Sequence, residues 1–244
     1  MKQQTSRDKS VYVAVFLMAG LILTTVAFAG DLATRGDTNV QLTEAERRWL
    51  AAHPVIRVAP DPEFPPFEFF DADGQYSGIA ADYLHLIERR LGVRFEAIRL
   101  NSWNEALEQA QARQVDLLAA AMMSPQRSKY MLTARPHINL PGVIVASTKT
   151  SETLTLEKLK GMKVAVVSGY VWQDLITNDY PDIYLDLVPN VQTGLRKTSF
   201  GLVDAMVGDP ATTTHYLEQE GITNLRIAGE SGYEYKLACL TRND

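Results

Sequence analysis

The sequence has almost no cysteine, no histidine in a metal-binding spacing and no run of basic residues. Cys239 is the single cysteine among 244 residues, which excludes an intramolecular disulfide and predicts a small buried hydrophobic residue at that position. The four histidines are scattered, with no HxxxH or Cys/His pattern, so neither a metal site nor a cofactor is expected. The net charge of −5, without a Lys/Arg cluster, excludes nucleic acid as a partner.

The remaining composition is that of a globular protein. Apolar residues make up 46% of the chain and charged residues 22%, which rules out disordered, collagenous and disulfide-stapled classes. A length of 244 residues suits one domain or two small lobes with a sizeable core. The sequence therefore predicts a globular body that needs neither metal nor disulfide to fold.

The N-terminus has the pattern of an export signal. Residues 1–10 carry three basic side chains and one acidic one, and residues 11–29 carry no charge. The apolar run ends in Ala27-Phe28-Ala29, the small-x-small pattern that signal peptidases accept, so residues 1–30 are interpreted as a cleaved signal peptide. The alternative is an uncleaved membrane anchor, because the run is just long enough to cross a bilayer.

A linker with one short helix, residues 31–54, precedes the body of the protein. Thr43 and Glu46 form a capping-box pattern, and Pro54 stops the helix. After it, apolar strands and amphipathic helices alternate, with a stiff aromatic loop at 60–70. The predicted strands are 55–59, 95–100, 115–122, 142–147, 162–167, 183–188, 202–207, 224–228 and 235–241. The predicted helices are 79–91, 103–113, 156–160, 170–177, 191–200 and 210–220.

This alternation predicts two α/β lobes with mostly parallel sheets. Residues 55–147 form the first lobe, 148–230 the second, and 231–244 return to the first as a strand. The polar segment 147–154 and the glycine-rich stretch 229–232 are the expected crossings. Two crossings define a hinge, and the cleft at the carboxyl ends of the strands is where open α/β sheets bind ligands.

At this level of detail the chain resembles family 3 of the bacterial extracellular solute-binding proteins, which have the two-lobed Venus flytrap fold of type 2 periplasmic binding proteins. Some segments look most like a subset of the family, the periplasmic input domains of hybrid sensor histidine kinases and membrane-bound diguanylate cyclases. The segments that carry the family resemblance are Val55-Ile56-Arg57-Val58 with 61–69, 76–82, Asn101-Ser102-Trp103, 115–127, 159–161 with 164–167, and 203–209. The segments that look most like the subset are 42–50, 78–83 and Val167-Ser168-Gly169-Tyr170.

The resemblance implies a ligand site in the cleft. Phe64 occupies the position of an aromatic that stacks on the ligand, Arg127 that of the guanidinium that holds a carboxylate, and Asp209 that of the group that takes an ammonium. Ala120 and Met122 stand where the family has hydroxyl donors, which predicts a more apolar site than that of an amino-acid receptor. The second-lobe loop adds Tyr170 and Val171, the latter where threonine is usual.

Each of these residues also has a structural interpretation. Arg127 on composition alone is a surface helix residue, and Asp209 before Pro210 suits a helix N-cap. Phe64, Phe67 and Phe69 suit a lobe core. The aromatic side chains of Trp103 and Trp172 suit core or interlobe packing, and Glu68 is assigned no chemistry.

Three functions fit the resemblance. The first is the sensory input of a transmembrane signalling protein, which binds a small polar or carboxylate-bearing molecule in the periplasm. The second is the receptor of an amino-acid ABC permease, and the third is a periplasmic cyclohexadienyl-type dehydratase. Catalysis is not expected, because the cleft segments supply no clear acid/base pair. The family's closing helix would follow Asp244, so the truncated lobe is expected to be less stable than one that carries it.

Overall fold

A computed structural model describes residues 40–244 of the protein, and residues 42–244 form one compact unit. The predicted signal segment, residues 1–30, lies outside the described residues. Across the described part of the chain, no helix has the length and apolarity needed to span a bilayer.

The first lobe begins with the capped helix and contains a small sheet beside the main one. As predicted, Thr43 and Glu46 form the capping box at the start of α2, and α3 ends where Gly92 adopts a left-handed conformation, with φ +70°. Its elements are α2 (Glu44–Ala52), β1 (Val55–Val58), β2 (Glu63–Phe64), β3 (Glu68–Phe70), β4 (Tyr76–Ser77), α3 (Ile79–Leu91), β5 (Arg94–Ala97), α4 (Trp103–Gln111), β6 (Leu117–Ala121), the 3₁₀ helix η1 (Arg127–Lys129) and β7 (Met131–Thr133).

The second lobe repeats the strand and helix alternation. Asn190 caps α6 and Asp209 caps α7 through their side-chain oxygens, which fixes where these helices begin. Its elements are β8 (Ile138–Ser147), η2 (Leu156–Leu159), β9 (Lys163–Val167), α5 (Val171–Asp179), β10 (Tyr184–Val188), α6 (Val191–Ser199), β11 (Ala205–Gly208), α7 (Pro210–Gln219) and β12 (Leu225–Arg242).

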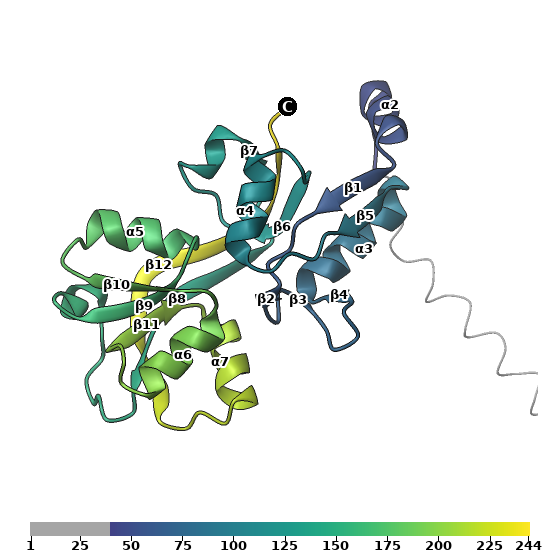
Figure 1. Ribbon diagram of the computed structural model, residues 1–244. Coiled ribbons are helices and arrows are strands. Elements are labelled where there is room, and N and C mark those ends of the chain that lie inside the picture. The colour runs from purple at the N-terminus through teal and green to yellow at the C-terminus, as the bar shows by residue number, and fades with distance from the viewer. Residues whose placement is uncertain (1–39) are drawn as a thin grey trace, which may run out of the picture. The chain divides into compact units, whose positions relative to one another are not determined.

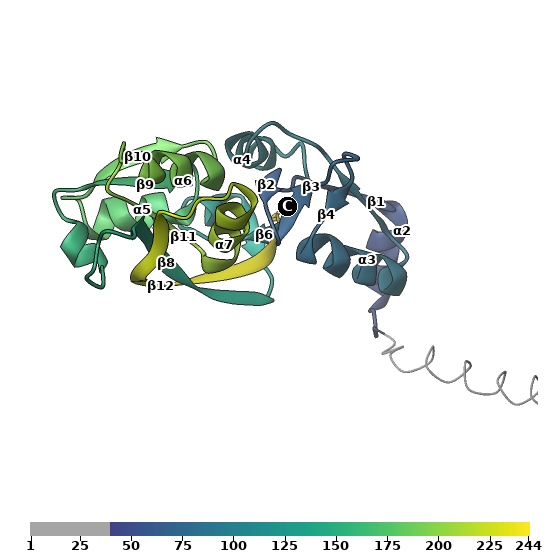
Figure 2. The ribbon, with the colours of Figure 1, turned by 90° about the horizontal axis from the view of Figure 1, so that it is seen from below.

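One sheet runs through both lobes, in the order β10-β9-β11-β8-β12-β6-β1-β5. The strands β1, β5 and β6 pair in parallel in the first lobe, and β9, β10 and β11 do so in the second. The antiparallel pair β8 and β12 connects the two groups (Figures 1 and 2). The fold is therefore the predicted two-lobed α/β architecture, with the lobes joined through long paired strands.

The strand β12 corrects the predicted hinge. Residues 224–228 and 235–241 were expected to be separate strands, but β12 is continuous over 18 residues. Its register against β8 shifts between Ile227 and Gly229 and again between Glu230 and Glu234. The glycine-rich stretch therefore bends a continuous strand instead of interrupting it, because these irregularities absorb the extra residues.

The polar segment after β8 is not the second crossing. Arg226 of β12 donates hydrogen bonds to the carbonyls of Thr150 and Glu152, both at 2.7 Å, and the Leu154 amide donates to Ala228 O at 2.9 Å. These bonds hold the segment against the second lobe. Residues 143–146, which were expected to complete the first lobe, instead pair with β11 in the second.

The aromatic loop at 60–70 also differs from the prediction, because it forms part of a three-stranded sheet, β2-β3-β4. Glu63 pairs with Phe69, and Phe64 pairs with Glu68. The alternation of acidic and aromatic residues allows this pairing to bury Phe64 and Glu68 together.

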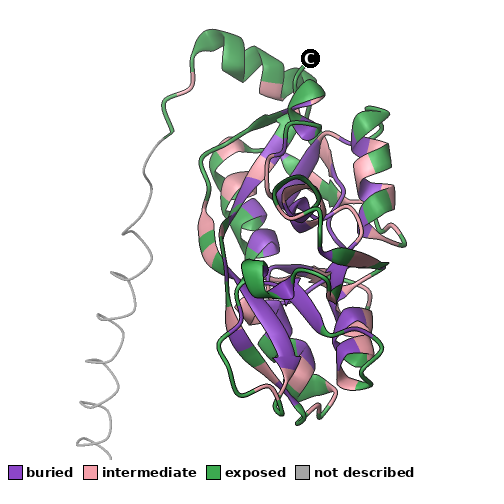
Figure 3. Cartoon of the chain, turned by 90° about the vertical axis from the view of Figure 1, so that its left-hand side faces the viewer, coloured by how far each residue is buried: buried purple, intermediate pink, exposed green. Residues whose placement is uncertain are grey.

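The core follows the central strands of both lobes (Figure 3). Every residue of β6 and of β11 is buried, as expected for strands covered on both faces. Phe67 and Trp172 are buried as well, in agreement with their core interpretation. Cys239, however, is only partly buried.

Candidate functional site

Four loops meet where strands of the two lobes end. Asp61 follows β1 and Arg127 follows β6 in the first lobe; Tyr170 follows β9 and Asp209 follows β11 in the second. The carboxyl ends of parallel strands are the usual position of ligand sites in α/β sheets. We therefore take this region, the interlobe interface, as the candidate site.

The loop at Gly169 and Tyr170 makes the central contacts between the lobes. The Tyr170 hydroxyl donates to Asp61 Oδ2 at 2.7 Å. The carbonyl of Gly169 accepts from Trp103 Nε1 at 3.1 Å and from Arg127 Nη2 at 2.6 Å. Three side chains of the first lobe thus bind two consecutive residues of the second.

Further hydrogen bonds join the lobes around this centre. Asn104 donates to the Ser168 hydroxyl at 2.9 Å. On β2, Glu63 accepts from Asn190 at 2.6 Å through its carboxylate and from the Tyr216 hydroxyl at 3.2 Å through its carbonyl. The lobes are closed on one another in this structure.

Aromatic rings fill the space between the lobes. Tyr170 makes edge-on contacts with Phe64, at a centroid distance of 5.7 Å, and with Trp103, at 6.3 Å. Tyr235 of β12 lies 6.0 Å from Phe64 and 5.0 Å from Trp172. Phe64, Tyr170 and Tyr235 are each at most 5% exposed, so these rings occupy the interior that a ligand would need.

Three carboxyl groups are buried in the same region. Burial raises the pKa of Asp61 to about 6, that of Asp209 to about 6 and that of Glu68 to about 8. Glu68 accepts from the Asp61 amide at 3.0 Å and from the Tyr76 hydroxyl at 3.1 Å. Hydrogen bonds thus hold Asp61 and Glu68 in place, although burial favours their neutral forms.

Arg127 is buried without an acidic partner. Its guanidinium donates to the carbonyls of Met122 and Gly169 and lies over the ring of Trp103, 5.3 Å from its centroid. Among residues 40–244 it forms no salt bridge, and burial lowers its pKa. An arginine keeps its charge even so, and a buried charge is costly unless an opposite charge compensates it.

The seven site residues predicted from the sequence lie around this interface, but they make different kinds of contact. Phe64 and Tyr170 touch, and Met122 and Arg127 share a hydrogen bond. Asp209 accepts the Thr212 amide at 2.8 Å, which is the capping interpretation. The remaining two are buried apolar residues: Ala120 in β6 and Val171 at the start of α5.

Sequence reasoning missed three residues of the interface, Asp61, Glu68 and Tyr235. Asp61 follows a strand and stands between prolines, a signal that points to the site once the parallel sheet is known. Glu68 carries no comparable signal, since its burial depends on pairing within the small sheet. Tyr235 lies on β12, within the strand that the sequence predicted to return to the first lobe.

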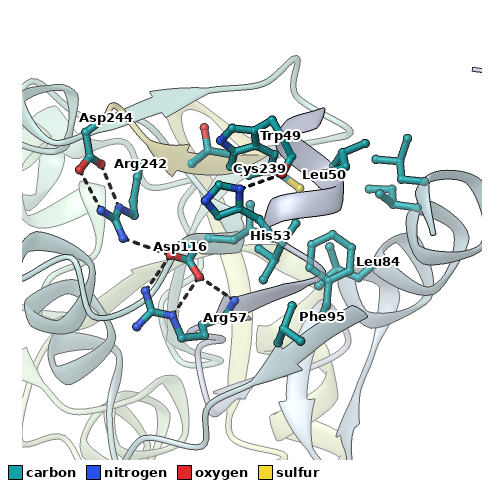
Figure 4. Close-up of a pocket in the computed structure, with 16 residues that line it drawn as sticks. Trp49, Leu50, His53, Arg57, Leu84, Phe95, Asp116, Cys239, Arg242 and Asp244 are labelled. Carbon is teal, nitrogen blue, oxygen red and sulfur yellow. Dashed lines mark hydrogen bonds and ion pairs between the residues drawn. The ribbon is translucent and has the colours of Figure 1, made fainter. Parts of the chain in front are cut away.

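A separate cavity of about 1050 Å³ lies in the first lobe (Figure 4). Its wall includes Trp49, Leu84 and Phe95, and at one side Asp116 accepts from Arg57 at 2.8 Å and from Arg242 at 3.2 Å. None of the seven predicted site residues lines it. No metal-binding group of three or more acidic, histidine or cysteine side chains occurs among the described residues.

The comparisons with known proteins agree with this architecture. The family model of bacterial extracellular solute-binding proteins, family 3, matches residues 56–215. The virulence sensor protein BvgS of Bordetella pertussis is 28% identical over 183 residues, which are 75% of this chain and 15% of that protein. The putative ABC transporter arginine-binding protein 2 of Escherichia coli K12 is 25% identical over 165 residues, 67% of each chain. This chain therefore spans a small part of the sensor relative's length.

Solved structures give the same result. The periplasmic VFT2 domain of B. pertussis BvgS superposes with a TM-score of 0.74 at 26% identity, covering 83% of this chain and 86% of that one. A histidine kinase sensor domain similar to periplasmic binding proteins has a TM-score of 0.73 at 25% identity, covering 78% and 83%. Since the family model matches well over half of its length, this chain belongs to family 3 of the bacterial extracellular solute-binding proteins.

Proposed function

We propose that this protein is the sensory input domain of a transmembrane signalling protein. A small polar or carboxylate-bearing molecule binds between the lobes, changes their closure and thereby biases a membrane-bound output module. The domain lies in the periplasm, exported by the signal segment at residues 1–30. The sensor relatives that match three quarters of this chain support this role.

The observation that carries the proposal is the buried guanidinium of Arg127. It lies in η1, which follows β6, and it contacts carbonyl oxygens and an aromatic ring but no carboxylate. The planar fork of arginine matches a carboxylate in two parallel hydrogen bonds. A ligand carboxylate would supply the missing negative charge, with Phe64 packing on the ligand and Asp209 facing its positive end.

The test is a binding measurement on a panel of amino acids and short carboxylic acids. By isothermal titration calorimetry, Arg127→Ala is expected to lose roughly 2–5 kcal/mol of the binding free energy of any carboxylate that the wild-type protein binds. Arg127→Lys should recover only part of it, because an ammonium lacks the fork. The matched control is Arg135→Ala, an exposed arginine of the first lobe, which should bind normally. Unchanged affinity in Arg127→Ala would contradict the proposal.

The second candidate is a receptor that delivers a solute to an ABC permease. The arginine-binding transport protein that matches this chain over two thirds of both lengths favours it. Both candidates use the same site, so binding does not separate them. Deletion of the gene separates them: loss of solute uptake supports the receptor, and loss of a transcriptional response to the solute supports the sensor.

We infer that the domain is not an enzyme, since the matching relatives are named as sensors and binding proteins. The dehydratase alternative has a direct test, because turnover of prephenate or arogenate by the pure protein would overturn this inference.

A further inference from the structure

The side chain of Tyr170 occupies the centre of the closed interface. Its ring lies against Phe64 and Trp103 of the first lobe and against Tyr235 of the connecting strand β12. Its hydroxyl donates to Asp61 across the interface at 2.7 Å. The ring thus has aromatic neighbours on several sides and one buried hydrogen-bond acceptor at its tip.

The residues that the resemblance assigns to the ligand are engaged by this same loop. Phe64, expected to stack on a ligand, packs against the Tyr170 ring instead. Arg127, expected to hold a carboxylate, donates to the carbonyl of Gly169, the preceding residue. Their partners in the closed structure therefore belong to the protein itself.

Burial shows that the loop takes up this space completely. Phe64, Asp61 and Arg127 are at most 5% exposed, and so is Tyr170. A solute could reach these three side chains only after Tyr170 and the Gly169 carbonyl had moved away. Tyr170 and Gly169 belong to the second lobe, whereas the three side chains belong to the first. Opening of the lobes therefore moves the Tyr170 side chain and the Gly169 carbonyl away from all three at once.

We propose that Tyr170 is an internal ligand that holds the lobes closed when no solute is bound, and that solute binds by displacing it. This inference rests on the proposed function, because it assigns the regulation of the same site. Opening of the lobes breaks the contacts of Tyr170 with Asp61, Phe64 and Trp103. A solute that then occupies the site replaces the internal ligand.

The contacts of Tyr170 define the chemical class of such a solute. It carries a flat apolar part that packs between Phe64 and Trp103, and a hydrogen-bond donor that reaches Asp61. A carboxylate on the same molecule pairs with Arg127 once the Gly169 carbonyl has left. An aromatic or cyclic acid with a hydroxyl or amino group satisfies all three requirements.

The test measures the distance between the lobes in the purified full-length chain. Spin labels are attached at two exposed sites, Glu108→Cys on α4 and Glu218→Cys on α7, in a Cys239→Ala background. Pulsed electron-electron double resonance then gives the distribution of distances between the two labels. The wild-type interface should show the short distance of the closed form without any solute.

Two variants of Tyr170 remove different parts of the internal ligand. Tyr170→Ala should shift the distribution to an open form with a longer distance. Addition of 4-methylphenol, which has the shape of the missing side chain, should restore the short distance at millimolar concentration. Tyr170→Phe keeps the ring but loses the bond to Asp61, so its closed-to-open ratio should fall on the order of tenfold. A merely structural tyrosine would lower the melting temperature and leave the distance unchanged.

The outcomes separate this inference from the proposed function. If Tyr170→Ala keeps the short distance between the labels, the inference that Tyr170 is an internal ligand is wrong, even if a carboxylate binds through Arg127. If Tyr170→Ala opens and 4-methylphenol closes it again, the inference that Tyr170 is an internal ligand is supported. If no carboxylate of the panel then binds the wild type or Tyr170→Ala, only the proposed function is overturned. Should Tyr170→Ala fail to fold, Tyr170→Phe and Asp61→Ala provide the same distance test, since the first removes the hydroxyl donor and the second the acceptor of the interlobe hydrogen bond, and neither removes a ring.

Discussion

As the pH rises from about 5 to about 8, the free energy of unfolding of this protein is expected to fall. Burial raises the pKa of Glu68 to about 8 and those of Asp61 and Asp209 to about 6, whereas the same groups titrate near 4 in an unfolded chain. The folded protein therefore holds more protons than the unfolded one in this interval. Stability declines with pH wherever that is so.

The size of the effect follows from the same shifts. One pKa unit corresponds to about 1.4 kcal/mol, so Glu68 alone contributes up to about 4 kcal/mol across this interval. Below about pH 3 these three groups are protonated in both states, and their contribution is constant. Carboxylates whose pKa is lowered, such as Asp186 beside Lys197, act in the opposite direction, but only at that acid end.

Urea unfolding at a series of pH values measures this dependence. The control is Glu68→Gln, whose amide oxygen can still accept the Asp61 amide proton but which does not titrate. Its stability should change much less than that of the wild type between pH values of about 6 and 8. If the free energy of unfolding changes equally with pH in the two proteins, Glu68 is not the titrating group. A rise in the stability of the wild type with pH would contradict the expected direction of the effect.

Replacement of Gly229 by alanine is expected to destabilise the protein by about 3 kcal/mol or more. A Cβ atom at this position would lie 1.9 Å from the carbonyl oxygen of Leu154, which is backbone and cannot rotate away. The amide of Leu154 donates to Ala228, the preceding residue, so the two segments are held together at the point of contact. Relief of the overlap would require this bond to lengthen or break.

Gly208→Ala is the matched control, since Gly208 also lies within a strand of the second lobe and is itself buried. A Cβ atom there would meet its nearest neighbour, Thr213 Oγ1, at 3.6 Å, which is an ordinary contact. Thermal unfolding should therefore place Gly208→Ala within about 1 kcal/mol of the wild type and Gly229→Ala far below it. Equal melting temperatures for the two variants would show that the backbone at Leu154 moves away from the added Cβ atom without loss of stability.

The sequence alone was sufficient for the elements whose signals are local. The capping box of Thr43 and Glu46, the end of α3 at Gly92 and the alternation of strands and helices are each written in neighbouring residues. Local signals of this kind depend on backbone conformation and short-range hydrogen bonds. They predicted two α/β lobes, and the resemblance that followed from them predicted the family.

The same signals located one connection between the lobes, near residues 229–232, but not its form, and they misplaced the other. Glycine-rich residues near Gly229 suggested a break, yet β8 lies alongside and keeps the strand paired through two register shifts. Whether glycine ends a strand or only bends it depends on the partner strand, which is distant in sequence. The predicted boundary after residue 147 was displaced for the same reason, since β8 pairs with β11.

Only the tertiary structure decided what the interface does. Tyr170 and Asp61 are 109 positions apart, and nothing near either residue indicates that one will donate to the other. Burial of Glu68 likewise depends on the small sheet closing over it, which raises its pKa. The sequence determined the lobes because their elements are specified locally. The sequence did not determine the interface, because desolvation and contact between lobes arise only once distant segments pack together.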